Sequence, residues 1–333
     1  MSGSSLPQQM IRLFMEIVPA QAILVAAKLG IADEIGANGA TSKELAASLA
    51  IDADALHRLL RLLAGVGVVE EREGDQFTLT ALGETLRSDS PVSVRNYAVY
   101  AHEFLYPGFG DLEETVRTGK PAFDRSFGMP LFSYLQQNRE RAAVFHAGIG
   151  NRGRIEARSI VDAYNFSTSK RVVDVGGGNG AFLSAIVTAH EGVSGVLQDR
   201  TAAIDAAKAG RGGPLPRCSF VDGDIFAEVF AGGDLYTLKR LLFDFADDDV
   251  VRILMNCRTA MPQTGRLLII EVLQGPSNQR DLAHAMDLVF LVMLGGRTRT
   301  AEHYASLLHR AGFKLARTIP TESDVTILEA TPA

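Results

Sequence analysis

The stretch VVDVGGGNGAF, Val172 to Phe182, places four glycines within five positions directly behind a β-branched apolar run. The run predicts a buried β-strand, and the segment AFLSAIVTAHE that follows has the length and composition of a helix. Gly176, Gly178 and Gly180 would then lie in the turn between a strand and its helix, at the edge where α/β sheets bind ligands. Because glycine is costly in chain entropy, three glycines at alternate positions indicate a ligand that approaches the backbone closely.

The chain after Lys170 continues this alternation. Short β-rich runs (VVDVG, GVLQD, CSFVDGD, DLYTL and GRLLIIEVL) are separated by helix-length segments such as TAAIDAAKAG and DDVVRILMNCRTAM. Strands that alternate with helices predict a parallel sheet with right-handed crossovers, and the segment from Thr298 to Ala333 adds a helix and two closing strands. We therefore expect an α/β fold, with a Rossmann-like domain over residues 168–333.

The N-terminal part reads as helices that end in a hairpin. Ile17–Leu29 has apolar residues at helical spacing and is ended by Gly30, and Thr41–Glu44 (TSKE) is a capping box for a second helix. Asp52 caps a third helix, and two β-rich runs meet across Glu73–Asp75, which has hairpin chemistry. Three helices and a hairpin predict a winged-helix domain.

This winged-helix-like domain, residues 1–92, raises the possibility of DNA binding. Its candidate recognition helix offers only His57, Arg58 and Arg61 as basic or polar groups, and three such groups are few for neutralising DNA phosphates. The formal net charge of −6 also argues against nucleic acid or an anionic membrane as the main partner. The small residues of VPAQAILVAAKLG favour contact with a second subunit, and hence a homodimer. A ligand-sensing DNA-binding regulator stays as an alternative.

Composition describes an ordinary globular chain of 333 residues, 47% hydrophobic and 22% charged, which is long enough for two domains. Cys218 and Cys257 have no metal-type spacing, and no His/Cys/acid cluster predicts a metal site, so we expect a reducing, cytoplasmic environment. MSGSSLPQQM has no secretory pattern, and no apolar run approaches the eighteen residues of a membrane span.

Residues 93–167 are predicted to be a helical linker with interleaved aromatic residues, in HEFLYPGF and AFDRSFGMPLFSYL. Prolines and glycines interrupt the helical period there. The aromatic residues either form core or line a concave apolar site for an acceptor, and both interpretations stay open.

Acidic residues end the first three strands of the predicted sheet: Asp174, Asp199 and the run Asp222–Asp224. The spacing from Gly176 to Ala181 also satisfies the dinucleotide pattern G-x-G-x-x-A, but that signal alone is weak. A carboxylate beside a pyrophosphate would repel it, whereas a ring of acids attracts a cationic nucleoside. The residues therefore favour S-adenosylmethionine (SAM) as the ligand.

Three segments together resemble one family: DVGGGNG, then LKRLLFDFADDDVVRILMNCRTAMPQTGRLLIIE, then MDLVFLVMLGGRTRT. They are similar to the SAM-dependent O-methyltransferases of the caffeate and hydroxyindole type, most strongly to bacterial members in secondary metabolism that act on phenazine-like heterocycles. The resemblance covers essentially the whole chain, because the predicted winged helix matches the family's dimerisation domain.

The resemblance implies SAM as cofactor, S-adenosyl-L-homocysteine as product, a small aromatic or heteroaromatic substrate, and no metal. It implies the cofactor-binding residues Asp174, Gly176, Gly178, Asp199, Asp224, Ile225, Phe226, Lys239 and Arg240. It implies an acceptor pocket formed by Phe104, Tyr106, Phe145, Asp287, Phe290 and Met293, with His102 beside them. Glu271 matches the acid that orients the family's catalytic histidine.

The chain departs from the family at the catalytic step. The family has histidine-aspartate-tryptophan after the basic pair, where this chain has Phe243-Asp244-Phe245. Phenylalanine accepts no proton, so position 243 supplies no base. His102 is the best-placed replacement base. His146 is a weaker one, and His284 and His303 lie on predicted helices.

Without a histidine beside it, Glu271 either binds a cationic or NH-bearing acceptor or only stabilises its turn. The simplest expectation is N-methylation, or methylation of an already acidic hydroxyl, by proximity and alignment. Phe243 would then stack on a flat acceptor or present its ring to the sulfonium. A SAM-bound family member that catalyses something other than methyl transfer is the alternative.

Overall fold

The computed structural model describes residues 5–210 and 212–333, which divide into two compact units. The first unit consists of the described residues up to Pro107 together with Leu135–Arg152. The second consists of Gly108–Tyr134 and Gly153–Ala333. The separate linker expected over residues 93–167 is thus shared between the two units.

The first unit is mainly helical, with a small sheet of strand order β1-β3-β2. Its elements are α1 (Leu6–Met15), α2 (Ile17–Leu29), α3 (Ile31–Ile35), β1 (Ala40–Thr41), α4 (Ser42–Leu49), α5 (Ala53–Gly65), β2 (Val69–Arg72), β3 (Gln76–Leu79), η1 (Gly83–Leu86), α6 (Arg95–Tyr100) and the π-helix η2 (Ala101–Leu105). The boundaries between the units fall in or near α7 (Tyr106–Gly110), α10 (Leu131–Gln137) and α11 (Arg139–Ala163).

The local signals read from the sequence form this unit as expected. Thr41 and Glu44 make the reciprocal capping box, in which the Thr41 backbone N–H donates to Glu44 Oε2 at 2.8 Å. Asp52 caps α5 by accepting from the Ala55 N–H at 2.8 Å, and Gly30 ends α2 with φ of 74°. The helices α2, α4 and α5 precede the β2–β3 hairpin, so the order of elements expected for a winged helix is present.

The basic side chains considered for DNA contact each lie beside a carboxylate. The three pairs are His57–Asp75 at 2.8 Å, Arg58–Asp54 at 3.9 Å and Arg61–Glu71 at 3.7 Å. Their charge is therefore partly neutralised within the unit, which further weakens the case for DNA binding.

The N-terminal helices are more apolar than a count of unbroken apolar runs indicates. In the described part of the chain, the helical stretch Leu6–Leu29 is long and apolar enough, by length and composition alone, to cross a membrane. Polar residues such as Arg12 and Glu16 interrupt the apolar run, so counting unbroken runs missed it. Its exposed apolar side chains are Leu6, Met10, Ile11, Leu13, Phe14, Met15, Ile17 and Val18. An apolar surface of this kind indicates a contact surface.

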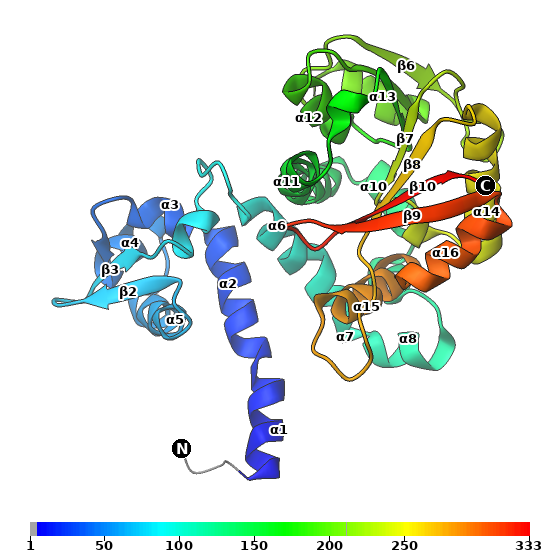
Figure 1. The fold of residues 1–333 in the computed structure, drawn as a ribbon. Helices are drawn as coiled ribbons and strands as arrows, with labels where there is room; N and C mark the ends of the chain where they lie inside the picture. Colours follow the sequence, from blue (N-terminus) through cyan, green and yellow to red (C-terminus); the bar gives the residue numbers. More distant parts are fainter. Residues whose placement is uncertain (1–4, 211) are drawn as a thin grey trace. The chain divides into compact units, whose positions relative to one another are not determined.

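The second unit is built on a seven-stranded sheet of order β6-β5-β4-β7-β8-β10-β9 (Figure 1). Its strands are β4 (Arg171–Val175), β5 (Ser194–Asp199), β6 (Cys218–Asp222), β7 (Leu235–Lys239), β8 (Arg266–Glu271), β9 (Phe313–Pro320) and β10 (Thr326–Pro332). β4 to β8 run parallel, whereas β10 is antiparallel to both of its neighbours.

Helices cover both faces of this sheet, and its central strands β4, β7 and β8 are accordingly buried over most of their length. The helices and short turns are α8 (Leu112–Thr118), α9 (Ala122–Phe127), η3 (Phe166–Thr168), α12 (Ala181–Ala189), α13 (Thr201–Lys208), η4 (Leu242–Asp244), α14 (Asp247–Ala260), α15 (Leu282–Leu294) and α16 (Ala301–Arg310). One apolar cluster packs α12 and α13 on one face, and another packs α14 and α16 on the other.

The strand order changes direction between β4 and β7. The chain runs from β4 outward to β5 and β6, then returns to place β7 on the other side of β4. The carboxyl ends of strands on either side of such a switch point leave a crevice for a ligand. The glycine turn after β4 lies at this point.

Candidate active site

The glycine turn between β4 and α12 is shaped by close contacts. Gly176 and Gly178 have φ of 68° and 61°, a conformation that side chains rarely adopt. A Cβ on Gly177 would lie 2.3 Å from Asp174 Oδ2, whereas a Cβ on Gly178 would meet no atom within 4 Å. The turn therefore packs its first glycines against the protein and leaves open space beside Gly178.

Asp174 is completely buried at the end of β4. Its Oδ1 accepts a hydrogen bond from Thr237 Oγ1 at 2.7 Å, and its Oδ2 has no hydrogen-bond partner. Burial raises the pKa of Asp174 to about 6, against the opposing effects of the Thr237 hydrogen bond and of Lys239. A buried carboxylate oxygen without a partner beside a glycine turn fits a cationic or N–H-bearing ligand.

Asp199 and Asp224 lie at the same edge of the sheet. Asp199 Oδ2 accepts from the Gly178 N–H at 2.8 Å, and its Oδ1 accepts from the Arg200 N–H at 2.7 Å. Asp224 Oδ1 accepts from the Phe226 N–H at 2.9 Å. Each carboxylate oxygen keeps lone pairs beyond the bond described, so both groups can still accept from hydroxyls or an amine.

Ile225 and Phe226 follow Asp224 and are partly buried. The Ile225 carbonyl accepts from Asn256 Nδ2 at 2.8 Å, and the Phe226 ring contacts Phe245 edge-on with centroids 5.2 Å apart. These contacts hold the loop after β6 at the carboxyl edge, where an adenine was expected.

Lys239 and Arg240, expected along the sulfonium side, are bound to a buried acid that sequence reasoning missed. Glu156 of α11 pairs with Lys239 Nζ at 2.8 Å and with Arg240 Nη2 at 2.6 Å, and Asp324 pairs with Arg240 at 3.1 Å. Burial opposes the charge on Arg240, but the two carboxylates outweigh it and raise its pKa. The basic pair is therefore a buried ion-pair cluster, with Arg240 at φ of 53°.

Phe243 lies in η4, the turn between β7 and α14. Its ring stacks on Phe290 of α15, with centroids 4.0 Å apart and planes at 17°. A Cβ on Gly296 would lie 2.7 Å from the Phe243 carbonyl oxygen, so the GG segment lets the two backbones approach. Of the other expected acceptor residues on α15, Met293 is buried, and Asp287 Oδ1 accepts from the Thr298 N–H at 2.6 Å.

Glu271 at the end of β8 accepts hydrogen bonds from the backbone of this same turn. Its Oε1 accepts from the backbone N–H groups of Leu241 and Leu242, each at 2.9 Å. Burial raises the pKa of Glu271 to about 7, while Arg240 and the two N–H groups act to lower it. These two hydrogen bonds favour the second of the roles considered for Glu271, the stabilisation of the turn.

Arg299 holds the turn from the other side and was also missed. It is fully buried, and it donates to the carbonyls of Leu242 at 3.0 Å and Phe245 at 2.7 Å and to Asp247 Oδ1 at 2.9 Å. An arginine in a segment that is otherwise small and polar carries no sequence signal of burial. Only the fold shows that it binds the backbone on both sides of Phe243.

The remaining expected acceptor residues belong to the first unit. Phe104 is buried and lies edge-on to Phe145 at 5.8 Å, whereas Tyr106 is 47% exposed. His102 lies in the π-helix, a type of turn that is common at functional sites, and its Nδ1 is buried without a hydrogen-bond partner. Burial, followed by the charge of Lys28, lowers the pKa of His102, which favours a neutral imidazole.

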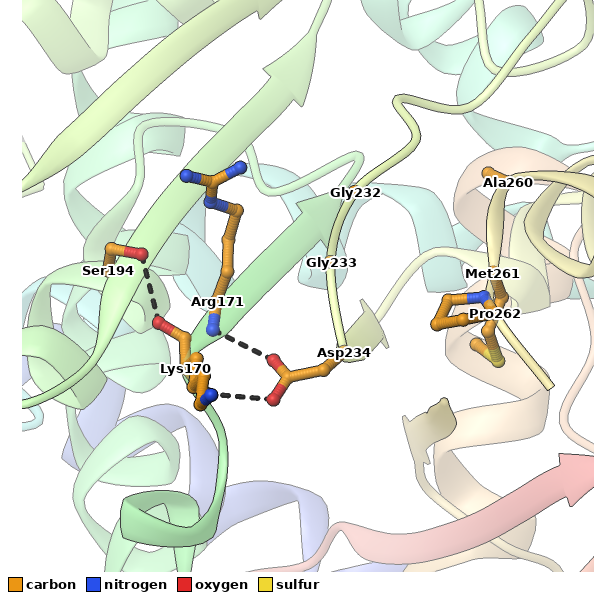
Figure 2. Close-up of a pocket in the computed structure, with 9 residues that line it drawn as sticks. All are labelled: Lys170, Arg171, Ser194, Gly232, Gly233, Asp234, Ala260, Met261 and Pro262. Atoms are coloured by element: carbon orange, nitrogen blue, oxygen red, sulfur yellow. Dashed lines mark hydrogen bonds between the residues drawn. The ribbon is translucent and has the colours of Figure 1, made fainter. Parts of the chain in front are cut away.

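A surface pocket of about 660 Å³ lies at the amino-terminal ends of the parallel strands, and Figure 2 shows the residues that line it. Lys170 and Arg171 precede or begin β4, and their backbone N–H groups each donate to Asp234 at 2.8 Å. The pocket lies at the amino ends of parallel strands, away from the glycine turn, so it is not the crevice that the topology predicts.

From the sequence we expected no His/Cys/acid cluster that could hold a metal ion, yet one group of such residues lies close together in the first unit. Among the described residues, His57, Glu71 and Asp75 bring three potential ligand atoms within 4.8 Å of one another, in the first unit. His57 and Glu71 already pair with Asp75 and Arg61 respectively, as exposed ion pairs do without a metal.

Fold and site together define a SAM-dependent methyltransferase: a doubly covered parallel sheet whose switch point has a glycine turn, an unsatisfied buried carboxylate and a second carboxylate on the neighbouring strand. Family models agree, matching an O-methyltransferase domain over residues 109–314 and an O-methyltransferase dimerisation domain over residues 11–89. The chain belongs to this O-methyltransferase family.

Three similar proteins illustrate the family. The phenazine O-methyltransferase PhzM of Lysobacter antibioticus is 40% identical over 94% of this chain and 92% of its own length. The phenazine-1-carboxylate N-methyltransferase of Pseudomonas aeruginosa is 30% identical over 93% of each chain. The solved structure of CalO1, a methyltransferase in calicheamicin biosynthesis bound to S-adenosylhomocysteine, has a TM-score of 0.89 and 34% identity, covering 99% of this chain and 100% of that one.

Proposed function

We propose that this enzyme methylates a small aromatic or heteroaromatic natural-product intermediate at a ring nitrogen or an already ionised hydroxyl. The observation that carries the proposal is Phe243: a ring stacked on Phe290 occupies the position at which the resemblance implies a histidine base. A nucleophile with a free lone pair needs no base, so alignment in an apolar site is sufficient.

SAM, when bound, supplies an electrophilic methyl group on a positively charged sulfur. We infer that Asp199 accepts hydrogen bonds from the ribose hydroxyls, that Asp174 and the glycines Gly176 and Gly178 surround the methionine part, and that Asp224 meets the adenine. The unpartnered Oδ2 of Asp174 and the open space beside Gly178 support this assignment. Lys239 and Arg240 then act through Glu156, by fixing the end of β7.

The activities of two relatives support a heteroaromatic acceptor. One acts on phenazines by O-methylation and the other on phenazine-1-carboxylate by N-methylation, so both chemistries occur among proteins similar to this chain. A flat heteroaromatic ring is also the shape that stacks on Phe243 and Phe290.

We infer that the whole protein is a cytoplasmic homodimer without a nucleic-acid or membrane partner. Residues 1–92 would supply the dimer contact, 93–167 part of the acceptor pocket, and 168–333 the cofactor site. The match to a dimerisation domain and the exposed apolar residues of α1 and α2 support this division.

Product mass tests the proposed reaction. The protein is incubated with SAM, with a chelator present, and with neutral ring-nitrogen heterocycles (quinoline, acridine and phenazine) or with phenols of graded acidity. We expect one added methyl group on a heterocycle or on an acidic phenol, and an equal amount of S-adenosylhomocysteine. Calorimetric SAM binding without methylation of any acceptor would instead favour the non-methyl-transfer alternative.

A further inference from the structure

The pocket of about 660 Å³ at the amino-terminal ends of β4 and β7 takes no part in the proposed reaction (Figure 2). Its volume lies within the range of about 300–1,000 Å³ that is typical of small-molecule sites. All of its lining residues belong to the second unit, and they lie at the end of the strands opposite the glycine turn. A molecule bound in this pocket would therefore not compete with SAM for space.

Two glycines keep one side of the pocket free of side chains. Gly232 has φ of 105°, a conformation that side chains rarely adopt, and a Cβ there would lie 3.8 Å from Arg171 Nη1. A Cβ on Gly233 would lie 2.5 Å from Val173 Cγ2, so glycine is needed for this loop to lie against β4. Because only backbone lines this side of the pocket, a flat molecule can approach it closely.

A second side of the pocket is apolar and held in place. It consists of Ala260, Met261 and Pro262, at the end of α14 and directly after it. Met261 is buried, and the buried Tyr236 of β7 donates its hydroxyl to the Ala260 carbonyl at 2.9 Å. This hydrogen bond ties the apolar wall to the sheet, so the shape of the pocket is formed before a ligand binds.

Two cations of the pocket have no counter-ion. Among the described residues, neither the Lys170 ammonium nor the Arg171 guanidinium has a hydrogen-bond or ion-pair partner, and both side chains are exposed. Asp234, the carboxylate that lines the pocket, accepts instead from the backbone N–H groups of these two residues. Two cations and one carboxylate leave the pocket with an excess of positive charge, in a chain whose formal net charge is −6.

We propose that this pocket is a second ligand site, which binds a small organic carboxylate with a flat apolar body. The guanidinium of Arg171 and the ammonium of Lys170 bind the carboxylate, since an arginine can hold both carboxylate oxygens at once. The apolar body lies against the glycine pair and the wall formed by residues 260–262. The same two cations disfavour SAM, whose net charge is positive, so the pocket is chemically distinct from the acidic cofactor crevice.

Calorimetry with three probes tests the chemistry of the ligand. The probes are 1-naphthoate, its neutral isostere 1-naphthamide and inorganic phosphate, each titrated into the whole chain with S-adenosylhomocysteine present. We expect 1-naphthoate to bind at least about tenfold more tightly than either of the others, because it alone has both the charge and the apolar body. Equally tight binding of phosphate would show that the cations take any anion and would overturn the proposal. Absence of naphthoate binding at millimolar concentration would overturn it as well.

Charge variants locate the site. Lys170→Gln with Arg171→Gln removes both cations but keeps the backbone N–H groups that bind Asp234. We expect this double variant to bind 1-naphthoate roughly tenfold to a hundredfold more weakly. The matched control, Arg310→Gln with Lys314→Gln, removes two exposed cations elsewhere in the second unit and should leave the affinity unchanged. Equal affinity of the two double variants would place the naphthoate elsewhere on the protein, and the proposal would fail.

Ala260→Glu is the converse variant, because it keeps both cations and adds a carboxylate to the apolar wall. We expect it to weaken 1-naphthoate binding at least about tenfold, through repulsion of the bound carboxylate and loss of apolar contact. Unchanged affinity in Ala260→Glu would contradict the assignment of this wall to the ligand.

Chemical labelling gives a direct readout of occupancy at the pocket. Acetic anhydride acetylates exposed lysines, and peptide mass spectrometry measures the rate at Lys170 and, in the same molecule, at Lys314. At a 1-naphthoate concentration ten times its Kd, acetylation of Lys170 should slow about tenfold while that of Lys314 stays the same. Equal rates with and without naphthoate at Lys170 would overturn the proposal. None of these readouts depends on methyl transfer, so their outcome is independent of the proposed reaction.

Discussion

Asp174 and Asp199 end neighbouring strands, yet their carboxyl groups have different surroundings. Asp174 is fully buried with one oxygen free, and burial raises its pKa to about 6. Asp199 receives one backbone N–H on each oxygen, from Gly178 and Arg200. At the scale of single residues, Asp199 is the better-placed acceptor for hydroxyls, because two backbone N–H groups fix its carboxylate and each oxygen keeps a further lone pair.

Asp199→Ala should weaken SAM binding by about 1.5–3 kcal/mol, the typical value for hydrogen bonds to a charged group. Calorimetry measures the loss, with Asp205→Ala on the exposed face of α13 as the matched control. Because Asp199 also accepts from Gly178, the unfolding midpoint of the variant without SAM should be recorded as well. Unchanged SAM affinity would remove Asp199 from the cofactor site.

Phe243→His should not produce a large gain in rate with ring-nitrogen acceptors. An imidazole there would give up the stacking on Phe290, and Glu271 already uses Oε1 for the backbone of the turn instead of orienting a histidine. Wild-type pH–rate profiles with acceptors of different basicity check this. A limb below the ordinary histidine pKa of about 6.5 that disappears in His102→Ala would identify His102 as a replacement base, because burial lowers the pKa of this histidine.

At the scale of elements, the decisive one is η4, a three-residue turn held from two directions. Glu271 at the end of β8 binds the backbone N–H groups that enter the turn, and Arg299 binds carbonyls at its start and end. The ring of Phe243 is thereby fixed by buried charges and not by its own packing alone. This predicts that variants of either charged residue act on the turn as a whole.

Arg299→Met should lower the free energy of unfolding by about 2–3 kcal/mol, because the carbonyls of Leu242 and Phe245 lose their donor. Arg310→Met is the matched control: it breaks an exposed pair with Asp248 and should cost about 1 kcal/mol or less. Denaturant unfolding of both variants measures the difference. Equal losses would mean that Arg299 contributes no more than a surface ion pair.

Glu271→Gln should change how stability depends on pH. The folded protein raises the pKa of Glu271 from 4.5 to about 7, so between these values the folded state binds more protons than the unfolded state. Stability contributed by the protonated form is therefore lost as pH rises from about 4.5 to about 7, on the order of 3 kcal/mol in total. Unfolding curves across this range should fall less steeply for Glu271→Gln, and parallel curves would contradict the shift.

At the scale of the whole molecule, the helices α1 and α2 present apolar side chains that a single chain leaves in water. Phe14 is 59% exposed and Ile11 is 50% exposed, within the region matched by the dimerisation domain. Burying such a surface against a second copy is the common solution in soluble proteins.

A double variant, Ile11→Glu with Phe14→Glu, should convert the proposed dimer to a monomer, since both charges would enter an apolar contact. Val116→Glu on α8, which is 70% exposed, is the control and should leave the mass unchanged. Light scattering at micromolar concentration measures both. A wild-type protein that is already monomeric would refute the dimer.

Much of this molecule follows from the sequence alone. Strand–helix alternation after Lys170 predicted the parallel part of the sheet, and the glycines predicted the turn between β4 and α12. The capping signals at Thr41 and Asp52 predicted helix starts that the structure confirms. These features depend on neighbours along the chain, so local chemistry is sufficient to reveal them. The expectation that Phe243 stands where the family has its histidine could also be read from the sequence, because it concerns one position in a motif.

What the tertiary structure decided is the electrostatics around that position. Glu156 and Arg299 are ordinary charged residues in the sequence, and nothing in their neighbours along the chain shows that they are buried or what they contact. Their roles come from partners distant along the chain, such as Lys239 for Glu156 and the Leu242 carbonyl for Arg299. Burial and pairing are set by the folded core, so the roles of Glu156 and Arg299 become visible only once the chain has folded.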